Sequence, residues 1–185
     1  GRHVMIASSL PILMPRSIHD VEQWNQHVAS GAWGRRAAVI AERMRREFDL
    51  EHWPAFPRGF ERMLRLVRGL AERPGPPESV TLLSGDVHHA YVSRLLLGDG
   101  AAPVHQVVAS PMRQTVTPAV MRIYRAGVGA LGRGVGRGLT RLSGARTGDE
   151  YAWERLTEPL FANHLATIDT SDAGVVLRIE TAHQT

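Results

Sequence analysis

The residues best suited to chemistry lie together in the segment VTLLSGDVHH, residues 80–89. Its first residues are apolar and β-branched without alternation, which is typical of a strand buried on both faces. Gly85, after the end of this strand, allows a sharp turn or the close approach of another backbone. Asp86 and His88, two apart in an extended segment, can project in one direction. We therefore predict them as metal ligands, because a carboxylate with an imidazole suits iron, manganese or zinc, and a carboxylate alone also suits calcium or magnesium.

Each of these residues also has a purely structural explanation. A lone aspartate can cap a turn, and a lone histidine can form a hydrogen bond at the surface. The combination of a buried strand, a glycine, an aspartate and two histidines favours the metal site over these alternatives. Functional sites in open α/β sheets also lie beyond the carboxyl ends of strands, which is where this segment ends.

Further strands are predicted on both sides of this segment, so the expected fold class is α/β. A turn at residues 98–100 joins two strands, and a turn at residues 171–174 forms a closing hairpin. The predicted strands are residues 3–9, 79–83, 90–97, 104–109, 165–170 and 175–181.

Two helical regions are predicted between the first and second strands. Asp20 is expected to cap a helix that begins at Val21, while Gly31 and Gly34 leave open one long helix or two shorter ones. A second amphipathic helix is expected after Pro57. The apolar stripes are Ala37, Ile40, Met44 and Phe48 in the first region, and Phe56, Phe60, Met63, Leu64, Val67 and Leu70 in the second. The histidines of the first region, His19, His27 and His52, are expected to be solvated.

A third helix is predicted from Val120 to Leu142, where apolar residues recur every three or four positions. Six arginines and no acids occur between Ala119 and Gly148. A helix packed on the domain is favoured over a helix lying on an anionic membrane surface. The expected apolar stripe is Val120, Tyr124, Val128, Leu131, Val135, Leu139 and Leu142, and the arginines are Arg122, Arg125, Arg133, Arg137, Arg141 and Arg146.

Composition limits the remaining choices. The 185 residues suffice for one domain with a real core, and the absence of cysteine excludes disulfides and thiolate metal sites. No apolar run reaches the ~18 residues of a membrane span, and the net charge of +4 gives no reason to expect a nucleic-acid partner. The sequence enters an apolar segment directly after Gly1 and Arg2, without a starting Met, so we expect a fragment of a longer protein, exported or cytoplasmic.

Three segments, SGDVHHAYVSRL, VHQVVASPMR and FANHLATID, occur in an order and spacing that resemble the C-terminal part of the alkaline phosphatase D (PhoD-like) metallophosphatases. The earlier stretches ASSLPILMP and EQWNQHVASGAWGRR resemble the same family, so the resemblance covers nearly the whole chain. Its most specific parts are the Ser-Gly-Asp-Val-His motif and the Ser-Pro-Met-Arg motif that ends at Arg113.

The resemblance implies a calcineurin-like sandwich of mixed β-sheets flanked by helices, with residues 1–185 as the C-terminal part of a single domain. It implies hydrolysis of phosphate esters at a multinuclear centre, with iron and calcium as the expected metals and manganese or zinc as alternatives. Metal ligation then carries over to Asp86 and His88. His89 is a candidate for catalysis, through contact with substrate or support of the ligands, and Arg113 for phosphate binding, with a structural salt bridge as its alternative.

Other ligands of the family belong to upstream motifs that this sequence does not contain: an early aspartate, a Gly-Asp-x-x-Tyr element and an Asp-Asp-His-Glu segment. The leading prediction is therefore a metal-dependent phosphatase or phosphodiesterase of which this chain is a part. The competing prediction is a catalytically incomplete binding module that contacts anionic surfaces through the arginine-rich helix.

Overall fold

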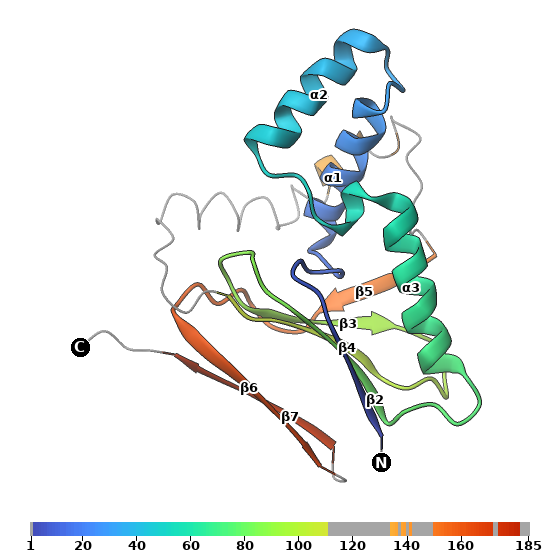
Figure 1. Ribbon diagram of the computed structural model, residues 1–185, viewed down its shortest axis with the longest axis vertical. Helices are drawn as coiled ribbons and strands as arrows, with labels where there is room; N and C mark the ends of the chain where they lie inside the picture. Colours follow the sequence, from blue (N-terminus) through green and yellow to red (C-terminus); the bar gives the residue numbers. More distant parts are fainter. Residues whose placement is uncertain are drawn as a thin grey trace. The chain divides into compact units, whose positions relative to one another are not determined.

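The computed structural model describes residues 2–110, 134–136, 138–139, 141, 150–171 and 174–181. The chain divides into two compact units (Figure 1). The first unit takes in residues 1–13, 63–117 and 150–185, and the second takes in residues 14–62 and 118–149. The expectation of a single domain over residues 1–185 stays a prediction.

The first unit contains a mixed five-stranded sheet in the order β1-β2-β4-β3-β5 (Figure 1). The strands β1, β2 and β4 run parallel to one another, whereas β3 is antiparallel to β4 and β5 is antiparallel to β3. This arrangement confirms an α/β fold with a mixed sheet. The strands are β1 (His3–Ala7), β2 (Ser79–Ser84), β3 (Tyr91–Leu96), β4 (Val104–Val108) and β5 (Ala152–Arg155).

The predicted strands β1 to β4 are confirmed to within two residues at each end. The strand β5 was not predicted, because this four-residue edge strand, AWER, lacks β-branched residues. The unalternating apolar run of β2 is explained by its central place in the sheet, where its first four residues are buried.

The predicted hairpin is confirmed as a separate two-stranded sheet of β6 (His164–Ser171) and β7 (Gly174–Thr181). Its register pairs Ile168 with Leu177. His3 in β1 forms hydrogen bonds through its two ring nitrogens with Ser79 Oγ (2.9 Å) and the carbonyl of Ser171 (3.2 Å). One imidazole therefore links the end of β6 to the first strands of the five-stranded sheet.

The helix α3 (Pro57–Glu72) begins at the predicted proline, which is favourable at the first position of a helix. Leu64, Val67 and Ala71 lie on one face of this helix and are fully buried. The carbonyl of Ala71 accepts a hydrogen bond from the backbone N–H of Ala102 (2.9 Å). The predicted apolar stripe is confirmed at Phe60, Leu64 and Val67, whereas Phe56 at its start is exposed.

The second unit contains two helices in place of the single long helix that was the alternative, α1 (Arg16–Ala29) and α2 (Arg35–Glu47). Asp20 as the cap of α1 is wrong. The helix begins at Arg16, so Asp20 lies within it. Asp20 is buried, and its carboxylate lies 3.4 Å from Arg16 Nε. Asp20 therefore forms an ion pair within the helix and does not cap its start.

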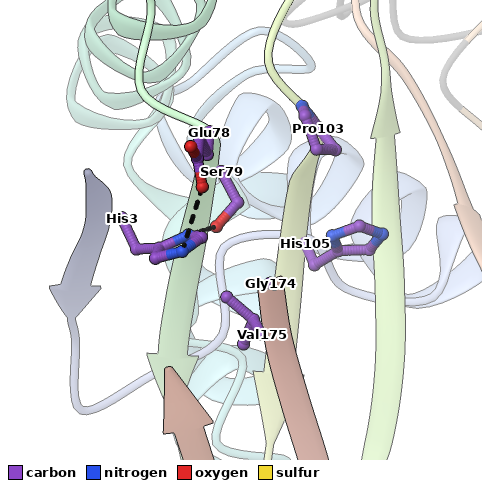
Figure 2. A pocket seen from close by; sticks show the side chains of 7 residues that line it. All are labelled: His3, Glu78, Ser79, Pro103, His105, Gly174 and Val175. Carbon is purple, nitrogen blue, oxygen red and sulfur yellow. Dashed lines mark hydrogen bonds and ion pairs between the residues drawn. The ribbon is translucent and has the colours of Figure 1, made fainter. Parts of the chain in front are cut away.

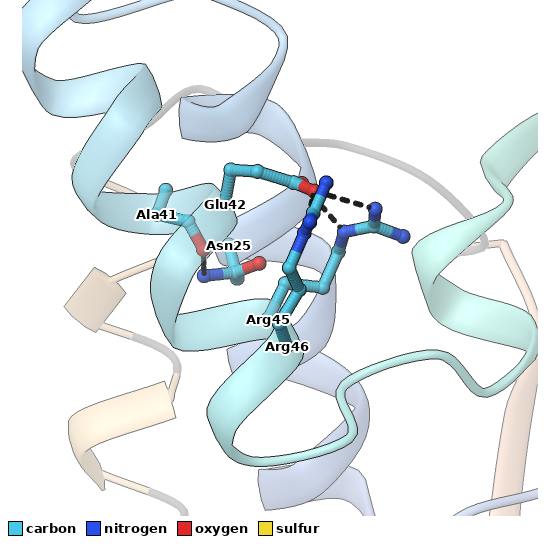
Figure 3. Close-up of polar contacts among 5 residues, drawn as sticks. All are labelled: Asn25, Ala41, Glu42, Arg45 and Arg46. Carbon is cyan, nitrogen blue, oxygen red and sulfur yellow. Dashed lines mark hydrogen bonds and ion pairs between the residues drawn. The ribbon is translucent and has the colours of Figure 1, made fainter.

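The predicted apolar stripe of α2 is wrong in part, because Ile40 and Phe48 are 62% and 65% exposed. Ala41 is the buried residue of this helix, and its carbonyl accepts a hydrogen bond from Asn25 Nδ2 of α1 (3.0 Å; Figure 3). On the same helix Glu42 pairs with Arg45 and Arg46, both at 2.8 Å (Figure 3). A small side chain and a polar contact therefore join α1 to α2, and the large apolar residues face outward.

Two histidines of the second unit are not solvated as predicted. His19 is fully buried, and its ring lies 5.0 Å from that of Phe60. His52 is mostly covered, and its Nδ1 lies 2.6 Å from Oε1 of the buried Glu22. Helical spacing does not distinguish a solvated face from a buried polar face, so these positions could not be assigned correctly from the sequence.

Candidate functional site

The candidate site lies where three parallel strands end. Because β1, β2 and β4 are parallel, their carboxyl ends meet at one edge of the sheet. Backbone hydrogen bonds continue past the strands, from Ser8 N to Leu83 O (2.9 Å), from Gly85 N to Ser9 O (3.2 Å) and from Ala109 N to Ser84 O (3.0 Å). The backbone that precedes Asp86 is thus held on both sides by its neighbours.

Gly85 is required by this close approach. A Cβ atom at this position would lie 3.2 Å from the carbonyl oxygen of Ala109 and 3.7 Å from Ser110 Cβ. The φ angle of Gly85 is not positive, so the glycine is not needed for a left-handed conformation. Its role is to make room for the end of β4. Of the two roles predicted for Gly85, a sharp turn or the close approach of another backbone, the structure supports the close approach.

Asp86 and His88 are exposed at this edge. Both adopt left-handed backbone conformations, with φ of 60° and 58°. Such conformations cost non-glycine residues free energy and persist only where the surrounding structure fixes them, which is common in functional loops. In the part of the chain that the structure describes, no group of three or more His, Asp or Glu side chains could hold a metal ion.

His89 is 2% exposed. Its Nδ1 must carry a proton, because it donates a hydrogen bond to the carbonyl of Val87. Its ring stacks on Tyr91, with centroids 5.3 Å apart, and lies 5.5 Å from the ring of Phe161. This placement favours support of the loop over direct contact with substrate, and its catalytic role stays a prediction.

A buried polar network behind the loop was not predicted. Gln106 Oε1 accepts hydrogen bonds from the backbone N–H groups of Ile12 (2.8 Å) and Leu13 (2.9 Å). The Tyr91 hydroxyl donates to the carbonyl of Leu13 (3.3 Å), and Gln106 Nε2 lies 3.5 Å from that hydroxyl. The available sequence signal was an amide in the middle of an apolar strand, which must find partners when it is buried.

Arg113 lies outside the described residues, and so does most of the predicted helix from Val120 to Leu142. Residues 134–136, 138–139 and 141 of that segment are helical. Gly136 is buried, and a Cβ atom there would lie 2.9 Å from Asp20 Cβ of α1. Val135 of the expected apolar stripe is 60% exposed, which contradicts its predicted place on a buried face. This helical backbone therefore approaches α1 through a glycine.

A cavity of about 410 Å³ lies in the first unit, away from Asp86 and His88. It is placed where the parallel strands begin, because it includes His3 and Ser79, the first residues of β1 and β2. Figure 2 shows His3 and His105 at its walls. Burial lowers the pKa of His105, and the nearby charge of Arg94 lowers it further, so neutral imidazole is favoured. The cavity contains none of the predicted site residues.

His164 is buried at the start of β6, and its Nδ1 lies 2.7 Å from the carbonyl of Ala162. No helix in the described part of the chain is long and apolar enough to cross a membrane.

No family model, curated protein or solved structure matches the chain.

Proposed function

We propose that this chain carries part of the active site of a metal-dependent phosphoester hydrolase, with Asp86 and His88 as metal ligands. The observation that carries the proposal is their placement: both are exposed and held in left-handed conformations at the carboxyl end of a central parallel strand. An exposed turn with no function would have little reason to keep two such residues, since glycine or asparagine adopts this conformation more readily.

The donor set fits the proposed group. A carboxylate and an imidazole together suit iron, zinc or manganese, and the carboxylate also suits calcium. A bound multinuclear centre would supply an acidified water and neutralise charge on the phosphoryl group. The remaining ligands would come from outside the described residues, in keeping with the upstream motifs of the PhoD-like enzymes. The calcineurin-like sandwich and the phosphate ester substrate belong to the same proposal.

The protein's own contribution is orientation. The backbone bonds of Ser84 and Gly85 to β4 and β1 fix where the loop leaves the sheet. The buried ring of His89 holds the carbonyl of Val87 between the two ligands. Both ligand side chains therefore extend from a segment that is anchored before and after them.

The test is the metal content of the purified chain, measured by elemental mass spectrometry for the wild type, Asp86→Asn and His88→Ala. We expect iron, zinc, manganese or calcium in the wild type and its loss from both variants. Asp99→Asn and His27→Ala serve as matched controls, because Asp99 lies in the turn between β3 and β4 and His27 lies within α1, and both variants should retain metal. Equal metal content in all five proteins would refute the ligand assignment.

A further inference from the structure

The loop between β2 and β3 has a backbone feature that metal ligation by its side chains does not require. The φ angle is positive at Asp86 and at His88 but not at Val87 between them. When successive residues alternate in handedness in this way, their backbone N–H groups turn toward one concave side and form an anion-binding nest. The loop therefore presents donors from its backbone as well as ligands from its side chains.

These donors have no partners in the described part of the chain. No hydrogen bond engages the backbone N–H of Asp86, Val87 or His88 there, whereas the flanking Gly85 donates to Ser9 (3.2 Å) and Ala90 donates to Leu160 (2.8 Å). Three successive N–H groups are thus left over between two anchored positions. Unpaired backbone donors are uncommon in folded proteins unless water or a ligand satisfies them.

A fourth donor precedes them in the chain. The hydroxyl oxygen of Ser84 is buried and has no hydrogen-bond partner among the described residues. A buried hydroxyl without a partner is costly, and it is most simply explained by a group that is bound when the site is filled. The loop and the residue before it therefore combine several unsatisfied donors at the carboxyl edge of a parallel sheet.

We propose that the backbone N–H groups of Asp86, Val87 and His88 bind a tetrahedral oxyanion. Several convergent donors at the end of a parallel strand are suited to the oxygens of a phosphoryl group, to which N–H donors form strong charge-assisted hydrogen bonds. The anion site stands on the backbone alone. Its identification with the phosphoryl group of a substrate rests on the proposed function.

The side chain of Asp86 opposes binding of this anion. Its carboxylate repels the anion, so inorganic phosphate binds weakly when no cation is present. Removal of the Asp86 carboxylate without a change in backbone conformation should therefore tighten phosphate binding.

The experiment is a titration of the isotope-labelled chain with inorganic phosphate in the presence of EDTA, followed by amide NMR shifts at constant ionic strength, with chloride as the control anion. Saturable downfield shifts of the Val87 and His88 amide protons are expected with phosphate and not with chloride. Because EDTA removes metals, this readout is independent of the metal content that tests the proposed function.

Paired variants separate the backbone from the side chains. His88→Gly retains the left-handed conformation and the N–H group, so phosphate binding should persist, whereas the β-branched His88→Val should weaken it at least about tenfold. Asp86→Gly should tighten binding roughly five- to tenfold, as expected from the loss of a unit charge about 5 Å away in water-like surroundings. Asp86→Val should abolish it.

Asp49→Val is the matched control, since Asp49 is also left-handed (φ 49°) but the following N–H groups of Leu50 and Glu51 are already bonded. This control should bind phosphate as the wild type does. Absence of phosphate-specific shifts in the wild type, or equal affinities of the glycine and valine variants, would overturn the proposal. If a valine variant fails to fold, the tighter phosphate binding expected of Asp86→Gly still tests the proposal.

Discussion

The left-handed conformation of His88 predicts that removal of this side chain stabilises the fold while it removes function. A non-glycine residue in this region costs roughly 1–2 kcal/mol relative to ordinary backbone conformations. Glycine removes that cost but loses roughly 0.5–1 kcal/mol more conformational freedom on folding. Because the side chain of His88 is exposed, little packing is lost with it. His88→Gly should therefore raise the free energy of unfolding by about 0.5–1 kcal/mol.

The assay is urea unfolding followed by circular dichroism, with EDTA present so that metal binding does not contribute to stability. The gain corresponds to an increase in Tm of roughly 1–4 °C for a chain of this size. The control is Arg43→Gly, at an exposed position within α2, where glycine should cost about 1 kcal/mol. The two glycine variants should shift the urea midpoint in opposite directions.

A His88→Gly variant that loses as much stability as Arg43→Gly would contradict this prediction. It would mean that the imidazole stabilises the loop through contacts of its own. A gain in stability together with a loss of bound metal would instead indicate a residue retained for function at the expense of stability.

Three further predictions concern other parts of the fold. Gly136→Ala should lose about 1–3 kcal/mol in urea unfolding, because its Cβ would lie 2.9 Å from a side-chain carbon, whereas Gly134→Ala, with nothing within 4 Å, should gain about 0.5–1 kcal/mol. Because the pKa of His105 is lowered, its contribution to stability is present above its ordinary pKa of 6.5 and is lost as the pH falls through the lowered pKa. In His105→Gln, the free energy of unfolding should therefore depend less on pH between about pH 7 and pH 5 than in the wild type. Gln106→Leu should cost about 2 kcal/mol or more and speed amide exchange at residues 12 and 13, because two buried N–H groups lose their acceptor.

Much of the strand content could be predicted from the sequence because it depends on local patterns. The apolar run before Gly85 and the glycine-rich turn at residues 98–100 specify β2, β3 and β4 by composition alone. The four-residue β5 carries no such pattern, and its pairing with β3 depends on residues about 60 positions away. Its position is therefore a tertiary property that no short window contains.

The helices show the opposite limit. Spacing predicted that α2 exists, but the face it buries is decided by its partner, and Ala41 faces α1 while Ile40 points outward. The site shows the same division. Residue types identified Asp86 and His88 as candidate ligands, whereas the left-handed backbone, the buried ring of His89 and the amide of Gln106 depend on contacts between distant segments.

The place of β1 in the sheet has a consequence for folding kinetics. Its pairing with β2 joins His3 to Ser79, which are 76 residues apart, and residues 14–62 of the second unit lie in the intervening loop. Closing a flexible loop of that length costs about 4 kcal/mol in chain entropy before the hydrogen bonds between β1 and β2 can stabilise the pairing. Contacts of such high sequence separation form slowly, so β1 should dock late unless the loop first shortens itself by folding. Amide exchange in β1 should then be faster than in β2 and β4, which would leave the edge next to Asp86 as the part of the sheet that opens first.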